Sequence, residues 1–177
     1  MQKCQLFRMA RDFANVNAEV ERFCLVNDIF FMDQAYVQAL KAYKFDEVPI
    51  GAVLVDAQGK VVARAYNQME HQQSQLAHAE LQVLAKYLKK NKNWRLSGTT
   101  LYVTIQPCLM CLGALYLSRV SRVVYGCGSL KFGATASEMK AFSGIYKNLK
   151  TSMHYLNYEK SKKLLRLFFK QKRSPGL

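Results

Sequence analysis

The fold of this chain is decided by one stretch, Thr99-Thr100-Leu101-Tyr102-Val103-Thr104-Ile105-Gln106-Pro107-Cys108-Leu109-Met110-Cys111. Its first half, Thr99 to Thr104, carries β-branched and aromatic residues and predicts a strand. Pro107 suits the first turn of a helix, because the N–H that proline lacks has no partner there anyway. Cys108 and Cys111 would then share one face of that first turn. The stretch therefore predicts a strand that leads two thiols to the start of a helix.

A second motif, His78-Ala79-Glu80, stands upstream and completes a set of metal ligands. Zinc prefers thiolate and imidazole ligands, and three protein ligands leave a fourth position open for water. The N–H groups and the dipole at a helix start favour thiolate over thiol. Zinc brings the pKa of a bound water close to neutrality, and a nearby Glu that is not a ligand can carry its proton. His78, Cys108 and Cys111 are thus the expected zinc ligands and Glu80 the expected proton shuttle, a pattern that points to hydrolytic deamination.

The helix that follows His78 should begin irregularly. In helical geometry Glu80 would lie about 200° around the helix axis from His78. Both side chains can face one metal ion only if the backbone is not yet helical at His78.

Two other interpretations of the cysteine pair compete with a catalytic site. A C-x-x-C after a strand and at a helix start also occurs in thioredoxin-like redox proteins. Here Pro107 precedes the pair, and the only later proline is Pro175 in the C-terminal tail, so a cis-proline opposite the thiols is not expected. A closed structural zinc site needs a fourth protein ligand. The remaining His and Cys residues stand at no second C-x-x-C or H-x-H spacing.

Charge is distributed unevenly along the chain. The net charge is +14, with 26 Lys and Arg against 12 Asp and Glu. Through Leu81 the net charge is −2, whereas from Gln82 onward it is +16, and the only acidic residues there are Glu138 and Glu159. A solvated surface of mixed charge would not separate in this way, so a polyanionic partner is expected. Together with a deaminase-like site, the charge favours nucleic acid.

Length, apolar content and cysteine number indicate one cytoplasmic domain. The chain has 177 residues, half of them apolar, which is enough for one buried core. The longest apolar runs, such as Pro49 to Val55, are strand-sized, so no membrane helix is expected. Arg8, Arg11 and Asp12 interrupt the region where a secretory signal would need an apolar run. Five cysteines, two of them expected to bind metal, suit a reducing cytoplasm.

The remaining pattern predicts an α/β fold with a mixed sheet of about five strands covered by helices. Apolar residues recur at helical spacing from Phe31 to Tyr43, and this helix should stop before Pro49. The other expected elements are strands at Ile50–Val55 and Val61–Tyr66 joined as a hairpin, a polar loop at Asn67–Ala77, a helix from His78, strands at Arg122–Tyr125 and Met153–Leu156, and a closing helix at Glu159–Lys172.

At these residues the chain resembles the cytidine/deoxycytidylate deaminase superfamily, and within it the bacterial tRNA adenosine deaminases. The resemblance runs from about Met32 to Arg173 and implies a three-layer α/β/α cytidine-deaminase-like fold. Besides the two metal-ligand motifs, it includes Glu47-Val48-Pro49-Ile50-Gly51-Ala52-Val53, Asn67, Gly113-Ala114, Arg119, Arg122-Val123-Val124-Tyr125-Gly126, Lys131, Gly133-Ala134, and Phe168-Phe169 followed by basic residues.

The resemblance implies conversion of adenosine to inosine at the wobble position of a tRNA anticodon. His78, Cys108 and Cys111 would hold one Zn²⁺ per subunit. Glu80 would take a proton from the zinc-bound water, protonate the purine N1 and later protonate the leaving ammonia. Family members are homodimers whose tRNA contacts involve both subunits, so a homodimer is implied as well.

The resemblance also implies substrate contacts. Asn67 would hydrogen-bond the flipped nucleotide, and Lys131 belongs to a segment that approaches the substrate ribose. Phe169 and the basic residues after it would meet the anticodon stem-loop by stacking and phosphate pairing. An alternative for Phe168 and Phe169 is that they dock the last helix on the core.

Three departures from the family pattern lie close to the expected site. Gln106 stands where the family usually has Glu before Pro-Cys, and we expect this change to alter local hydrogen bonding rather than chemistry. Ser74-Gln75-Leu76 replaces the common Asp-Pro-Thr, and Cys127-Gly128-Ser129 replaces a stretch that usually carries an acidic residue. These changes bear on the substrate more than on the type of reaction.

Residues 1–30 have no counterpart in the resemblance and are expected to be an N-terminal extension, such as a helix that packs on the domain, whereas residues 31–177 are expected to form the zinc-dependent deaminase domain. Met32 would be an alternative start for a chain of ordinary family length. Two alternatives to tRNA editing stay open. One is deamination of a free base such as guanine or cytosine, and the other is a non-catalytic RNA-binding module with structural zinc.

Overall fold

A five-stranded mixed sheet forms the centre of the computed structural model, which describes residues 27–129, 131–145 and 151–173. The strand order is β2-β1-β3-β4-β5. Strand β1 pairs antiparallel with β2 and β3, whereas β3, β4 and β5 are parallel. The strands are β1 (Gly51–Val55), β2 (Val61–Tyr66), β3 (Thr100–Val103), β4 (Arg122–Tyr125) and β5 (Ser152–Tyr155). The expected mixed sheet is confirmed, with the last strand one residue earlier than predicted.

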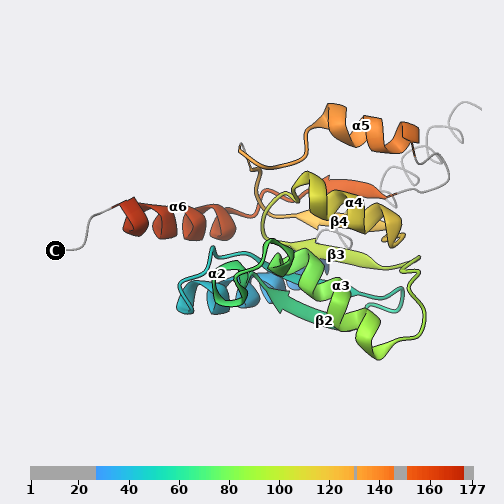
Figure 1. Ribbon diagram of the computed structural model, residues 1–177, viewed down its shortest axis with the longest axis horizontal. Helices are drawn as coiled ribbons and strands as arrows, with labels where there is room; N and C mark the ends of the chain where they lie inside the picture. Colours follow the sequence, from blue (N-terminus) through green and yellow to red (C-terminus); the bar gives the residue numbers. More distant parts are fainter. Residues whose placement is uncertain (1–26, 130, 146–150, 174–177) are drawn as a thin grey trace, which may run out of the picture.

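Helices cover both faces of this sheet, so the expected three-layer fold is confirmed (Figure 1). Helices α3 (Ala79–Lys90) and α4 (Leu109–Leu117) lie on one face, and α5 (Ala136–Ile145) follows β4. The helix of residues 27–44 lies on the other face. Helix α6 (Glu159–Arg173) packs against that helix, where the rings of Tyr43 and Phe168 are 6.3 Å apart.

The core follows the two-residue period of the strands. Alternate side chains of β1, β3 and β4 face the helix of residues 27–44, and they are Val53, Val55, Tyr102 and Val124. The intervening side chains face α3 and α4, and they are Ala52, Leu54, Leu101, Val103 and Val123. Because both faces of the central strands are buried, these strands read as continuous apolar runs.

Gly51 allows the helix of residues 27–44 to pack closely on β1. A Cβ at this position would lie 2.1 Å from the Ala35 carbonyl oxygen and 2.3 Å from the Ala39 nitrogen. No larger residue fits without moving the backbone. The close approach fixes the start of β1 beside Thr104, whose Oγ1 accepts a hydrogen bond from the Gly51 N–H at 3.1 Å.

The segment predicted as a polar loop, Asn67–Ala77, contains two short helices, so that prediction is wrong. Helix α2 spans Met69–Gln72, and a 3-10 helix spans Gln75–Ala77. The N–H groups of Glu70 and His71 donate to the Glu47 carboxylate at 3.2 and 2.7 Å. The acceptor that stabilises α2 therefore comes from a distant part of the sequence.

The first helix extends upstream of residue 31, where the deaminase domain was expected to begin. Asp28 is 6% exposed and forms a bidentate pair with the Arg122 guanidinium, with N–O distances of 2.7 and 2.6 Å. The Tyr102 hydroxyl donates to the same carboxylate at 2.8 Å. Residues 1–26 of the expected N-terminal extension lie outside the described residues. In the described part of the chain, every helix is too short or too polar to cross a membrane.

Candidate active site

His78 lies at the boundary where α3 begins. Its backbone is non-helical, with φ −59° and ψ 144°, while its carbonyl accepts the first helical hydrogen bond, from the Gln82 N–H at 2.9 Å. The 3-10 helix that ends at Ala77 leads into this position. The irregular start predicted at His78 is therefore confirmed. It lets His78 and Glu80 point to the same place despite their spacing.

The structure brings the three expected metal ligands together. The Nδ1 atom of His78 lies 3.7 Å from the Cys108 sulfur and 3.4 Å from the Cys111 sulfur. All three ligand atoms lie within 4.8 Å of one another. Tetrahedral zinc with Zn–S of about 2.3 Å and Zn–N of about 2.0 to 2.1 Å places N and S roughly 3.6 Å apart. The donor set and its spacing therefore fit a zinc ion with one position left open.

The two sulfur atoms differ in their proton affinity. A hydrogen bond from the Cys111 thiol, assisted by one from the His78 ring, lowers the pKa of Cys108 to about 4. The pKa of Cys111 is raised by its hydrogen bond to Cys108 and by burial. The pKa of His78 is raised chiefly by its hydrogen bond to Cys108. Both neighbours thus favour negative charge on the Cys108 sulfur, and a divalent cation can take the place of protons in such a ligand set.

Glu80 lies beside the triad without being one of its ligands. Its side chain is 3% exposed, on the first turn of α3. Burial raises the pKa of this carboxyl above its usual range, and Cys111 is its hydrogen-bonding neighbour. A buried carboxyl with a raised pKa next to an open metal position is suited to accept and return a proton.

The helix that carries the cysteines begins later than predicted. Cys108 is its N-cap, with extended backbone at ψ 171°, and Leu109 is its first helical residue. Pro107 lies before the cap because its carbonyl accepts the Ala134 N–H at 3.0 Å and Cys108 forms an isolated antiparallel bridge with Gly133. Cys111, fully buried on the first turn of α4, still points to the same metal position.

The Gln106 side chain fixes the segment after β4 that contains Ser129 and Ala134, and this segment lies against the start of α4. Its Nε2 donates to the Ala134 carbonyl at 2.7 Å, and its Oε1 accepts the Ser129 N–H at 3.3 Å. A Cβ on Gly133 would lie 2.7 Å from the Ser129 backbone carbonyl oxygen as well as 2.5 Å from the Gln106 Oε1, so a larger residue would have to move the backbone. A glutamate at position 106 could not donate to the carbonyl of Ala134. The hydrogen bond to the Ala134 carbonyl therefore depends on the amide of Gln106.

Asn67 lies next to the metal site, with its amide held in one orientation. The adjacent Gln68 donates its N–H to the carbonyl of Ala77, the residue before His78, at 3.0 Å. The Asn67 Nδ2 donates to the buried Glu47 carboxylate at 3.1 Å. The Asn67 Oδ1 is buried and has no hydrogen-bond partner among the described residues. Since a carboxylate only accepts, Glu47 turns the amide so that its oxygen is left for another donor.

Glu47 was not predicted to have a function, although it begins the motif Glu47 to Val53 that belongs to the family resemblance. It is 1% exposed, and its carboxylate accepts from three donors that all lie in one segment, residues 67–71. An acidic residue immediately before an apolar strand was the only available signal.

The two other predicted substrate contacts lie outside the metal triad. Lys131 is exposed in the segment held by Gln106, with its ammonium 5.1 Å from the ring centre of Phe132. Phe169 is 44% exposed on α6, whereas Phe168 is 5% exposed. Phe168 therefore docks α6 on the core, which was one of the two interpretations for this pair. Phe169 is left with an accessible ring.

Comparison with known proteins places this site in a family. The cytidine and deoxycytidylate deaminase zinc-binding region matches residues 25–127, and the chain belongs to this family.

Among its relatives are proteins named tRNA-specific adenosine deaminase. The one from Bacillus subtilis (strain 168) is 46% identical over 115 residues, which are 65% of this chain and 71% of the relative. The one from Buchnera aphidicola subsp. Schizaphis graminum is 40% identical over 147 residues, which are 82% of this chain and 96% of the relative.

Solved structures with similar folds include deaminases. One from studies of A-to-I editing by tRNA:A34 deaminases at the wobble position of transfer RNA has a TM-score of 0.71 and 36% identity, over 77% of this chain and 99% of that one. A guanine deaminase from Nitrosomonas europaea has a TM-score of 0.67 but 21% identity, over 78% of this chain and 82% of that one. At this identity the second likeness shows a shared fold alone.

Proposed function

We propose that the chain deaminates adenosine to inosine at the wobble position of a tRNA anticodon. The observation that carries this proposal is the triad of His78, Cys108 and Cys111 beside the buried Glu80, a carboxyl outside the ligand set. It occurs in a chain that is 40–46% identical to tRNA-specific adenosine deaminases.

The chemistry is a hydrolysis, in which water adds to C6 of the purine and ammonia leaves. His78, Cys108 and Cys111 would hold a zinc ion, which when bound would lower the pKa of a water molecule toward neutrality. Glu80 takes the proton released from that water and delivers it to N1 of the base. It then takes the proton of the new C6 hydroxyl and passes it to the amino group, so that C6 becomes a carbonyl carbon and ammonia leaves. Its burial suits both steps, because a carboxyl in an apolar site titrates closer to neutrality than one in water.

Asn67, Lys131 and Phe169 are the substrate contacts that we propose. The buried Asn67 Oδ1 lacks a partner within the described residues and is oriented to accept a hydrogen bond from the nucleotide. Lys131 offers an exposed ammonium on the segment pinned over Cys108. Phe169 offers an exposed ring on the last turns of α6, where the basic residues Lys170, Lys172 and Arg173 follow. Stacking together with phosphate pairing is how proteins bind single-stranded RNA loops.

We further propose a cytoplasmic homodimer with one zinc per subunit. The described residues contain one group of potential metal ligands. Cys108, Cys111 and Cys127 form no disulfide bond with one another, which is typical of a reducing compartment. Helix α4 exposes Leu109, Met110 and Leu117, an apolar surface suited to a second copy.

Inosine formation tests the proposed function. Zinc-loaded protein is incubated with tRNA that carries adenosine at the wobble position, and inosine is measured by nuclease digestion and chromatography. Transcripts with guanosine at that position, free guanine and free cytosine are run in parallel. We expect inosine from the adenosine tRNA alone. Turnover of a free base without inosine would instead identify a nucleobase deaminase, and zinc and RNA binding without any turnover would identify a non-catalytic module.

A further inference from the structure

A second basic surface surrounds the C-terminal end of α3, and the proposed chemistry makes no use of it. Its cations lie on the last two turns of α3, on the loop that follows and just after α4. We call this surface the basic end. It comprises Lys86, Lys89, Lys90, Arg95, Arg119 and the indole of Trp94.

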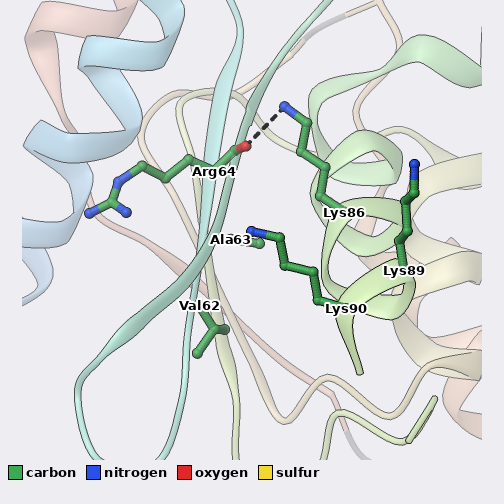
Figure 2. Close-up of a pocket in the computed structure, with 6 residues that line it drawn as sticks. All are labelled: Val62, Ala63, Arg64, Lys86, Lys89 and Lys90. Carbon is green, nitrogen blue, oxygen red and sulfur yellow. Dashed lines mark hydrogen bonds between the residues drawn. The ribbon is translucent and has the colours of Figure 1, made fainter. Parts of the chain in front are cut away.

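A hollow of about 340 Å³ lies within this surface, between β2 and α3 (Figure 2). Lys86 donates to the Arg64 carbonyl on β2 at 3.2 Å, and Lys90 reaches from the next turn toward the same strand. Arg64 turns its guanidinium away from the lysines and donates to Gln34 at 2.8 Å. The lysine ammonium groups therefore supply the positive charge of the hollow.

The charges of the basic end are not neutralised by neighbouring carboxylates. The sequence has no acidic residue between Glu80 and Glu138. The four ion pairs found among the described residues involve none of the basic-end cations. Attraction to the negative end of the helix dipole explains why lysines occur at positions 89 and 90, in the last turn of α3. It does not account for Arg95 or Arg119, which lie outside α3.

An aromatic ring lies among these cations. Trp94 is 49% exposed, and the guanidinium groups of Arg95 and Arg119 lie 4.3 and 5.6 Å from its ring centre. Exposed aromatic rings beside Arg and Lys are typical of surfaces that bind nucleic acid, where rings stack on bases and cations pair with phosphates. This combination favours RNA over an anionic lipid surface.

The basic end is far from the metal site. At 1.5 Å per residue along α3, Lys86 lies about 12 Å and Lys90 about 18 Å from His78. In Figure 1, α3 and α4 begin on the side where α2 and α6 lie and run toward the opposite side. A nucleotide bound at His78 therefore leaves the basic end free for another part of the same RNA.

We infer that the basic end binds backbone phosphates of tRNA outside the anticodon stem-loop. The inference rests on the proposed function for the identity of the RNA. It adds a second contact, on a different side of the molecule from Phe169 and α6.

The test compares two matched double variants of the full chain. One is Lys89→Gln with Lys90→Gln, and the control is Lys41→Gln with Lys140→Gln, two exposed lysines on other helices. Binding to full-length tRNA and to the isolated anticodon stem-loop is followed by fluorescence anisotropy over a range of salt concentrations. We expect the first variant to bind full-length tRNA about fivefold or more weakly at 0.1 M salt, with the salt slope reduced by about 1.4 to 1.8 for two lost phosphate contacts. Its affinity for the stem-loop and its kcat should match those of the control.

Several outcomes would overturn the inference. Unchanged affinity of the Lys89/Lys90 variant for full-length tRNA, or an equal loss of affinity for the stem-loop, would contradict it. Aggregation of this variant at unchanged tRNA affinity would show that the lysines only protect the open edge of β2. Loss of binding to phosphatidylserine vesicles but not to tRNA would identify a lipid surface as the partner. Failure of the proposed function would look different, because the unmodified protein would then form no inosine even if the lysine variant lost RNA affinity.

Discussion

Glu80 is the residue on which the proposed chemistry depends most directly. Its carboxyl is buried beside the metal triad but is not needed to hold a metal. We therefore expect Glu80→Ala to retain zinc and to lose about 10² to 10⁴ in kcat, the usual contribution of a general acid–base group. Cys108→Ala should lose both zinc and turnover. Zinc is measured by elemental analysis and turnover by inosine formation in tRNA.

Glu80→Gln is the control for packing, since it keeps the volume of the side chain. It should behave like Glu80→Ala, because an amide cannot carry the proton. If either Glu80 variant turned over like the unmodified protein, Glu80 could not be the proton shuttle.

Glu47 sets the orientation of the Asn67 amide and through it the affinity for substrate. As a carboxylate, Glu47 accepts from Asn67 and from two backbone N–H groups of α2. In Glu47→Gln one of those sites becomes a donor, and Asn67 relieves the clash by turning its own oxygen inward. The substrate then meets a donor instead of an acceptor. We expect KM for tRNA to rise about tenfold, the equivalent of about 1.4 kcal/mol, with kcat changed little.

A double-mutant cycle separates this positioning role from a structural one. Asn67→Ala should raise KM by a similar factor, and Glu47→Gln should add nothing in the Asn67→Ala background. Zinc content should be unchanged throughout. Additive effects on KM, or a loss of zinc in Glu47→Gln, would contradict the positioning role.

At the scale of elements, the strands and long helices could be predicted because their patterns are local. Residues close together in the sequence determine the alternating burial of β1 and β3, and they also determine the start of α3 at His78. Helix α2 could not be predicted, because its stabilising acceptor, Glu47, lies more than 20 residues away. The first turn of α4 was predicted to include Pro107, whereas Pro107 lies one residue before the N-cap, because Ala134 and Gly133 pair with the backbone there.

The start of the first helix is another element that local pattern did not define. Asp28 ties this helix to β3 and β4 through Tyr102 and Arg122, and its hydrogen bonds raise the pKa of the Arg122 guanidinium. A chain that began at Met32 would leave both partners without this carboxylate. We expect Asp28→Ala to lower the free energy of unfolding by about 2 to 3 kcal/mol, as for other charged hydrogen bonds that lose one partner.

Glu159→Ala is the matched control, since it removes an exposed carboxylate that pairs with Lys162 at 3.5 Å. An exposed pair of this kind contributes up to about 1 kcal/mol. Urea unfolding curves of both variants measure the difference. Equal destabilisation would show that Asp28 is not an anchor of the first helix.

At the scale of the whole molecule, charge and apolar surface are segregated. Basic side chains gather on α6 and at the basic end, at opposite ends of the molecule in Figure 1. Helix α4 lies beside α3 in the same layer, and it has no charged residue in its sequence, Leu-Met-Cys-Leu-Gly-Ala-Leu-Tyr-Leu. A helix that is apolar all round normally lies inside a protein. Its exposed side chains therefore favour a partner that covers them.

A second copy of the chain is the partner that we expect, because homodimers with two-fold symmetry place the same patch on both sides of the interface. Leu117 is 52% exposed and lies at the end of α4 away from the cysteines, so a change there leaves the metal ligands in place. Leu117→Glu would bring two buried like charges together and should weaken dimerisation at least about tenfold. Leu40→Glu, at a 42% exposed leucine on the opposite layer, should leave the dimer intact. Sedimentation equilibrium at micromolar concentration measures both, and a dimer that survives Leu117→Glu but dissociates in Leu40→Glu would place the interface on the other face.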